Sequence, residues 1–118
     1  MRSFFANAVD AVEVQELNVF AVILAEERDG GGKRFEIQKA LSFDEQDKGL
    51  GMDTYCLCTE EGATHYGGIE SYILGENALQ ITLGMSATQT LGIDGSFLIY
   101  FDPTKRTLIQ WGLDRVLK

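Results

Sequence analysis

The sequence lacks positive charge over nearly half of its length. From Gly49 to Thr104 there is neither lysine nor arginine, whereas seven carboxylates fall in the same 56 residues: Asp53, Glu60, Glu61, Glu70, Glu76, Asp94 and Asp102. Residues 44–104 carry ten acids and one base, and the whole chain has a net charge of −8. Charge of this kind governs the choice of partner more than the fold. It favours a basic protein partner, and a merely solvated acidic surface is the alternative.

Long apolar runs are also missing. The longest, Val19 to Ala25, has seven residues, whereas a helix that crosses a bilayer needs about twenty. Polar residues interrupt the N-terminus too early for a signal peptide, so we predict a cytoplasmic protein that contacts no membrane. Pro103 is the only proline, and the 13 glycines form no linker. We therefore expect one domain spanning residues 1–118.

The chain has only two cysteines, Cys56 and Cys58, in a segment that reads as a strand. Positions two apart in a strand share a face, and a disulfide between them has poor geometry. We predict free thiols that act as small core hydrophobes. His65 follows seven residues later, but no fourth ligand stands at a recognisable spacing for zinc. The sequence predicts no metal site and no cofactor.

Hydrophobic periodicity predicts an α+β protein. We expect a mainly antiparallel sheet of about six to seven strands, with a short helix and a C-terminal helix packed on one face. Alternation of apolar and polar residues is clearest from Phe35 to Phe43. The segment 17–26 is apolar at odd and at even positions, as in a strand covered on both sides. A helix remains the alternative for residues 11–26. Strands are expected at 17–26, 35–43, 54–60, 66–74, 78–83 and 96–101.

Capping residues predict the two helices. Ser86 suits an N-cap and Leu91-Gly92 a C-terminal stop, so a helix of one to two turns is expected there. Asp102 and Pro103 are a favourable N-cap and first residue for a helix that continues to about Leu117. Its apolar arc includes Gly112, which would permit close approach to a strand. Trp111 lies at the rim of that arc, where it either packs on the sheet edge or anchors an interface.

No pattern of catalytic residues stands out. His65 is the only histidine, and no third group is spaced to orient it against Cys56, Cys58 or Asp53. The simpler interpretation is a turn histidine whose ring hydrogen-bonds to the backbone beside Gly67 and Gly68. Nucleic acid is disfavoured as a partner because phosphate contacts need cations. The candidate group for such contacts is Lys105, Arg106, Arg115 and Lys118 on the last helix.

One stretch resembles a known family. The sequence from Asp53 to Ile69, DTYCLCTEEGATHYGGI, is similar to the core motif of the Immunity protein 10 family, in which a tyrosine-bearing strand is followed by a turn and Tyr-Gly-Gly-aliphatic. Its most specific part is Tyr66-Gly67-Gly68. The later order of strand, small helix, strand and leucine-rich helix is similar as well.

The resemblance implies a non-enzymatic antidote of a bacterial polymorphic toxin system, which binds and neutralises a cognate toxin encoded beside it. The acidic half-chain adds our inference of a basic toxin such as a nuclease. The residues we predict to face the toxin are Asp53, Glu60, Glu61, His65, Tyr66 and Trp111. Two alternatives stay open: a small enzyme or ligand-binding domain that uses His65, Tyr66, Cys56 and Cys58, and a homo-oligomer with a solvated acidic face.

Overall fold

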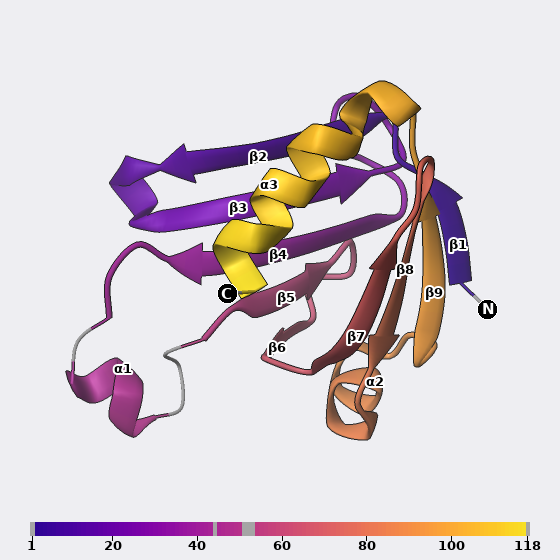
Figure 1. Ribbon diagram of the computed structural model, residues 1–118. Coiled ribbons are helices and arrows are strands. Elements are labelled where there is room, and N and C mark those ends of the chain that lie inside the picture. Colours follow the sequence, from indigo (N-terminus) through magenta and orange to yellow (C-terminus); the bar gives the residue numbers. More distant parts are fainter. Residues whose placement is uncertain (1, 44, 51–53, 118) are drawn as a thin grey trace.

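The computed structural model describes residues 2–43, 45–50 and 54–117. Over these residues, nine strands form two sheets (Figure 1). The predicted α+β class is confirmed, but there are more strands than the six to seven expected, and they form two sheets. The strands are β1 (Arg2–Phe5), β2 (Ala8–Val14), β3 (Val19–Ala25), β4 (Arg34–Ala40), β5 (Cys56–Thr59), β6 (Thr64–Tyr66), β7 (Ile69–Leu74), β8 (Ala78–Leu83) and β9 (Ser96–Tyr100). The helices are α1 (Glu45–Gly49), α2 (Met85–Leu91) and α3 (Arg106–Leu117), with 3₁₀ turns η1 (Gln15–Leu17) and η2 (Pro103–Lys105).

The first sheet has five antiparallel strands in the order β2-β3-β4-β5-β6. Residues 11–26, for which the sequence left strand and helix open, are strand on both sides of η1. Ala11, Val22, Ile37 and Leu57 lie in register across four strands and are all buried, so they mark the inner face. The prediction that 17–26 is covered on both sides holds only in part, because on the outer face Ala21 and Ala25 are buried, whereas Val19 and Ile23 are only partly buried.

The second sheet has four strands in the order β1-β9-β8-β7. The N-terminal strand β1 pairs with β9 in parallel, and the other two pairings are antiparallel. As predicted for 78–83, Leu79, Ile81 and Leu83 share the buried face of β8. Between Ile69 and Ser71 the register of β7 against β8 shifts by a β-bulge, which places an extra residue in this edge strand.

The chain passes from one sheet to the other between β6 and β7. Gly67 and Gly68 occupy this corner with φ values of 71° and 106°, a region that residues with a Cβ rarely adopt. A Cβ on Gly68 would also lie 2.5 Å from the Cβ of Ala87 in α2. The single strand predicted over 66–74 is therefore wrong, because the two glycines break it and its halves join different sheets.

The C-terminal helix begins as the sequence predicts. The Asp102 side chain accepts a hydrogen bond from the backbone N–H of Thr104 at 3.0 Å, and Pro103 opens the first turn, which is 3₁₀ rather than α. In contrast, α2 begins one residue before Ser86, at Met85, and its N-cap is Gly84, which makes no side-chain cap. The predicted Ser86 N-cap is wrong, although the left-handed Gly92 that ends α2 is confirmed.

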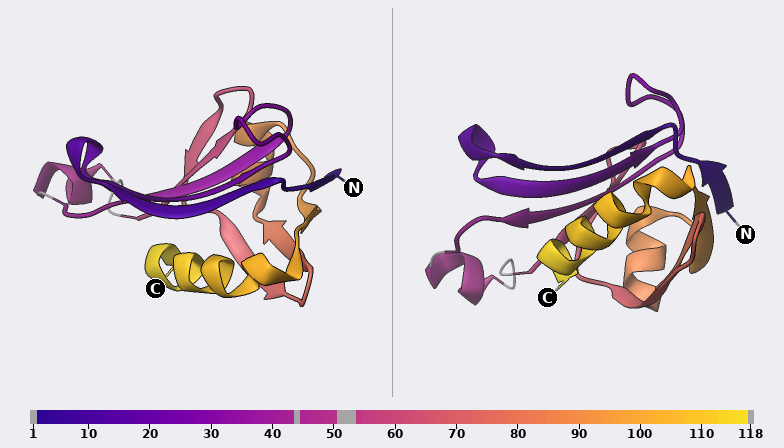
Figure 2. Two further views of the ribbon diagram at one scale, coloured as in Figure 1. Left: turned by 90° about the horizontal axis from the view of Figure 1, so that it is seen from above. Right: turned by 45° about the horizontal axis from the view of Figure 1, so that its top comes forward.

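Helix α3 packs across the inner face of the five-stranded sheet, in contact with β2, β3 and β4 (Figure 2). A Cβ on Gly112 would lie 2.8 Å from Val22 Cγ2 and 3.0 Å from Ala11 Cβ, so the predicted close approach is confirmed. The four-stranded sheet lies on the same side. There the rings of Phe35 and Phe97 meet edge to face at 5.0 Å, joining the two sheets in one core. Both sheets thus turn their other faces outward.

Candidate functional site

The two thiols lie on the outer face of the five-stranded sheet. In the register of β5, Cys56 pairs with Gln38 and Tyr66, while Cys58 pairs with Glu36 and Thr64. The shared face predicted for the cysteines is confirmed, and both thiols are free. The expected role as core residues is wrong, since both are only partly buried and Leu57 between them fills the core instead.

The two thiols act on one another. A hydrogen bond from Cys58 lowers the pKa of the Cys56 thiol to about 7, against the opposing effect of partial burial, and the backbone of His65 lowers it further. The same hydrogen bond raises the pKa of Cys58, as do burial and the neighbouring negative charges of Cys56 and Glu36. Cys56 is therefore the thiolate of the pair near neutral pH, and thiolate is the nucleophilic form.

His65 faces the opposite side of the sheet from the thiols, because it pairs with the buried Leu57. Its Nδ1 lies 3.0 Å from the Gly67 carbonyl oxygen, so the predicted hydrogen bond to the backbone is confirmed, although His65 lies in strand β6 and not in a turn. Its Nε2 lies 3.2 Å from the hydroxyl of Ser86 in α2. The ring therefore ties the glycine corner to the short helix.

The predicted partner-facing residues lie on different parts of the molecule. Tyr66 is 43% exposed on the outer face of the five-stranded sheet, and Glu61 is exposed in the turn that precedes β6. Trp111 is 48% exposed on α3, with its ring edge to face against Phe20 at 5.3 Å. Asp53 lies outside the described residues. The structure brings Glu60, Glu61 and Tyr66 to one hairpin, β5–β6, and separates them from Trp111.

Glu60 is engaged within the molecule. Its carboxylate forms an ion pair with Arg2 and accepts a hydrogen bond from the backbone N–H of Arg34 at 3.0 Å. Burial raises the pKa of Glu60, but the hydrogen bonds from Arg2 and Arg34 outweigh burial and lower it to about 2. Its charge is therefore largely balanced by a neighbour and contributes little to attracting a partner.

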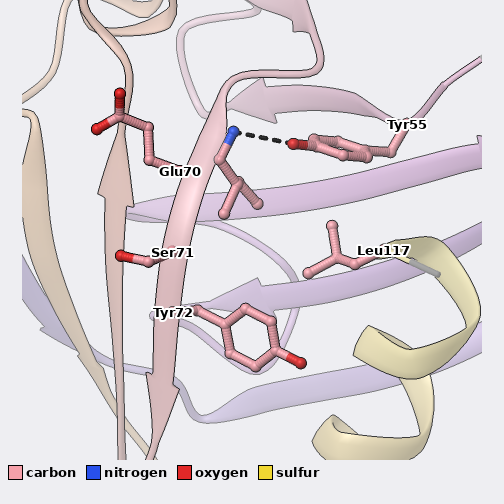
Figure 3. A pocket seen from close by; sticks show the side chains of 6 residues that line it. Tyr55, Glu70, Ser71, Tyr72 and Leu117 are labelled. Carbon is pink, nitrogen blue, oxygen red and sulfur yellow. Dashed lines mark hydrogen bonds between the residues drawn. The ribbon is translucent and has the colours of Figure 1, made fainter.

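A cleft that the sequence did not indicate opens between the two sheets and the end of α3. It has a volume of about 350 Å³ and is lined by Tyr55, Ile69, Glu70, Ser71, Tyr72 and Leu117. Figure 3 shows the rings of Tyr55 and Tyr72 turned to this side of β7, whereas Glu70 and Ser71 point to the other side. The Tyr55 hydroxyl accepts a hydrogen bond from the Ile69 backbone N–H at 2.9 Å, which fixes the start of β7. Tyr55 lies within the motif that resembles the family, but only the folded chain shows that it lines a cleft together with Tyr72.

The side chains of the predicted alternative site do not converge on one point. His65 lies on the inner side of β6, whereas Cys56, Cys58 and Tyr66 lie on the outer side. Within residues 2–43, 45–50 and 54–117, no three His, Cys, Asp or Glu side chains are grouped as metal ligands. The helices in this part of the chain are too short or too polar to cross a membrane.

Together the fold and these residues define a two-sheet α+β protein whose polar and aromatic groups are spread over several surfaces. A family model described as Immunity protein 10 matches residues 5–108. The chain therefore belongs to the Immunity protein 10 family, as the Tyr66-Gly67-Gly68 motif indicated. No curated protein and no solved structure shows a significant match.

Proposed function

We propose that this protein binds a cognate toxin in the cytoplasm and neutralises it without catalysing a reaction. The observation that carries the proposal is the family match over residues 5–108. A toxin partner follows in general from membership of an immunity protein family. We add that the toxin is basic, because the chain has a net charge of −8 and no lysine or arginine from 49 to 104.

The charge distribution suits rapid capture of a cationic protein. Complementary fields steer diffusional encounter and raise the association rate, most strongly at low salt. A nuclease is a toxin of this kind, because it must be cationic where it grips phosphates. The same acidity repels nucleic acid, so the proposed antidote competes with the substrate of such a toxin without binding that substrate.

The enzyme or ligand-binding alternative at His65, Tyr66, Cys56 and Cys58 gains no support. A catalytic pair must lie within hydrogen-bond reach on a common site. Strand alternation instead places His65 on the face opposite the thiols and Tyr66, because His65 pairs with Leu57 and Tyr66 pairs with Cys56. The one histidine is already hydrogen-bonded to Gly67 and Ser86.

The decisive experiment uses the toxin encoded beside the gene for this protein. We expect co-expression to restore the growth of cells that the toxin alone kills, and titration calorimetry of the purified pair to show a complex. The association rate should fall steeply as salt is raised. If the purified protein fails to bind the product of the adjacent gene, the proposal is wrong.

A further inference from the structure

The regularly paired positions on the outer face of the four-stranded sheet carry no charge; the carboxylate that β7 turns to this side, Glu70, belongs to its β-bulge (Figure 3). Strand alternation places ten side chains there, two from β1, two from β7, three from β8 and three from β9. Five are apolar, namely Phe5, Ile73, Ala78, Leu98 and Tyr100, and the other five are serine, threonine or glutamine. In a chain of which 24% is charged, ten uncharged positions side by side have the composition of an interface centre, where charged residues are depleted and aromatic residues are enriched.

This face is open to solvent. Ile73 is 66% exposed, Phe5 47% and Tyr100 40%, whereas Ile99 on the inner side of β9 is fully buried. Figure 1 shows α3 and the five-stranded sheet on the inner side of β1-β9-β8-β7, and no described helix or strand over the outer side. Phe5 and Tyr100 are cross-strand partners, so their exposed rings form one patch.

The two ends of the face differ. At the apolar end, formed by the β7–β8 turn and the close of β9, lies a row of Ala78, Tyr100 and Phe5, and the next row runs from Ile73 through Gln80 to Leu98. At the other end the paired positions are hydroxyl-bearing: Ser71, Thr82 and Ser96.

Carboxylates flank the hydroxyl-bearing end. The β-bulge of β7 carries Glu70 there, and Figure 3 shows its carboxylate on the side away from the cleft. Asp94 lies in the connection from α2 to β9, at the same end of the sheet. No lysine or arginine occurs anywhere from residue 69 to 104.

Charges of both signs flank the apolar end. Glu76 and Asp102 lie beside it, and so do three bases. Arg106 hydrogen-bonds to the carbonyl oxygens of Leu74 and Gly75. Arg28 and Lys105 line a shallow cleft of about 290 Å³ with Phe5 and Asp102. Bases thus lie beside the acids at the apolar end, whereas the stretch 69–104 that carries Glu70 contains no lysine or arginine.

We propose that this outer face binds the toxin, an inference that rests on the proposed function. It fits a protein surface with an apolar patch placed against Phe5, Ile73 and Tyr100 and with a lysine or arginine side chain placed against Glu70. Apolar area supplies the affinity, and the Glu70 carboxylate sets the orientation and raises the association rate.

A second copy of this chain fits the face less well. A two-fold contact uses the same patch on both partners. With the axis along the strands, Glu70 of one copy would approach Glu70 of the other. With the axis across the strands, the apolar end of each copy would meet the hydroxyl-bearing end of its partner. Only a partner of different composition matches both ends.

The test measures the affinity of the toxin encoded beside the gene for variants on each face. Ile73→Ser and Tyr100→Ser should each weaken binding about tenfold or more, as truncation of an interface anchor does. Val12→Ser is the matched control, because Val12 is 36% exposed on the outer face of the other sheet; it should stay within about threefold of the wild type. Urea unfolding checks that every variant is folded.

A second arm tests the charge. Glu70→Gln should slow association at low salt, and the difference should vanish as salt is raised. Glu16→Gln, at an exposed position in η1 on the other sheet, is the control and should leave the association rate unchanged.

The outcomes separate the two proposals. If the wild-type protein does not bind the toxin, the proposed function fails. If it binds, but Ile73→Ser and Tyr100→Ser bind like the wild type while Val12→Ser or Glu61→Lys weakens binding, the function stands and this surface is wrong. The inference is also overturned if light scattering shows a wild-type dimer that Ile73→Ser converts to a monomer with unchanged toxin affinity.

Discussion

Gly112 gives the sharpest test of how α3 packs on the five-stranded sheet. In a solvent-exposed helix, Gly→Ala would stabilise by about 1 kcal/mol. Here the added Cβ would lie 2.8 Å from Val22 Cγ2 and 3.0 Å from Ala11 Cβ, whereas carbon atoms prefer about 3.5–4.0 Å. Val22 is fully buried and stiff, and Ala11 Cβ is fixed to the backbone of β2. Neither neighbour can yield without a movement of the helix.

The two effects oppose each other. Overpacking a tight core costs about 1–3 kcal/mol, which exceeds the gain of about 1 kcal/mol in helix propensity. We expect Gly112→Ala to lower the free energy of unfolding by about 1 kcal/mol, or the melting temperature by about 4 °C. Gly112→Val adds two more methyl groups and should lower the free energy of unfolding by more than about 3 kcal/mol.

Urea denaturation followed by circular dichroism measures these changes. Thr107→Ala, at an exposed position of the same helix, is the control and should be neutral or stabilising by up to about 0.5 kcal/mol. Adding Val22→Ala to Gly112→Ala removes the clashing methyl group, so the pair should be less destabilised than the sum of the single changes. A Gly112→Ala variant that is more stable than the wild type would show that the helix is not held against β3 as described.

Three further predictions concern single side chains. Because the pKa of Glu60 is lowered from 4.5 to about 2, its ion pair with Arg2 should stabilise the fold fully above about pH 4.5 and lose this effect as the pH falls through 2. After a discount for solvent screening, we expect the ion pair to contribute about 1 kcal/mol to the free energy of unfolding. If Glu60→Gln lowered the free energy of unfolding equally at pH 6 and at pH 2, this expectation would be contradicted. Tyr55→Phe removes the hydroxyl that accepts a hydrogen bond from a backbone N–H and should lower the free energy of unfolding by about 1–2 kcal/mol. The control Tyr72→Phe should change the free energy of unfolding by less than about 0.5 kcal/mol. Chemical denaturation measures both changes. Because the pKa of Cys56 is about 7, its alkylation by iodoacetamide should reach half its maximal rate near pH 7, and a midpoint near 9 would refute the thiol pairing.

Local signals predicted several elements well. Asp102 and Pro103 marked the start of the last helix, because an N-cap carboxylate and a proline act within one turn. The apolar alternation of β8 marked its buried face, since side chains alternate along any strand. Gly112 was recognised as a point of close approach because glycine is costly inside a helix and needs a reason to be there.

Other features could not be read from local patterns. Strand β1 pairs in parallel with β9, about a hundred residues later in the chain, and nothing within Arg2–Phe5 encodes that partner. The segment 66–74 has the composition of one strand, yet Gly67 and Gly68 turn it into two strands of different sheets. Similarly, strand alternation correctly predicts that Cys56 and Cys58 share one face. It does not reveal that this face is the outer one and that Leu57 points into the core.

The sequence by itself determined the α+β class, most element positions, the family and the segregation of charge, because these depend on residue types and short-range periodicity. Only the tertiary structure decided which face of each sheet is covered. That choice depends on where α3 and the opposite sheet pack, which is a property of contacts between distant segments. As a result, Ile99 is buried while its neighbour Tyr100 in the same strand is exposed. The surface that we assign to the toxin depends on this choice of face.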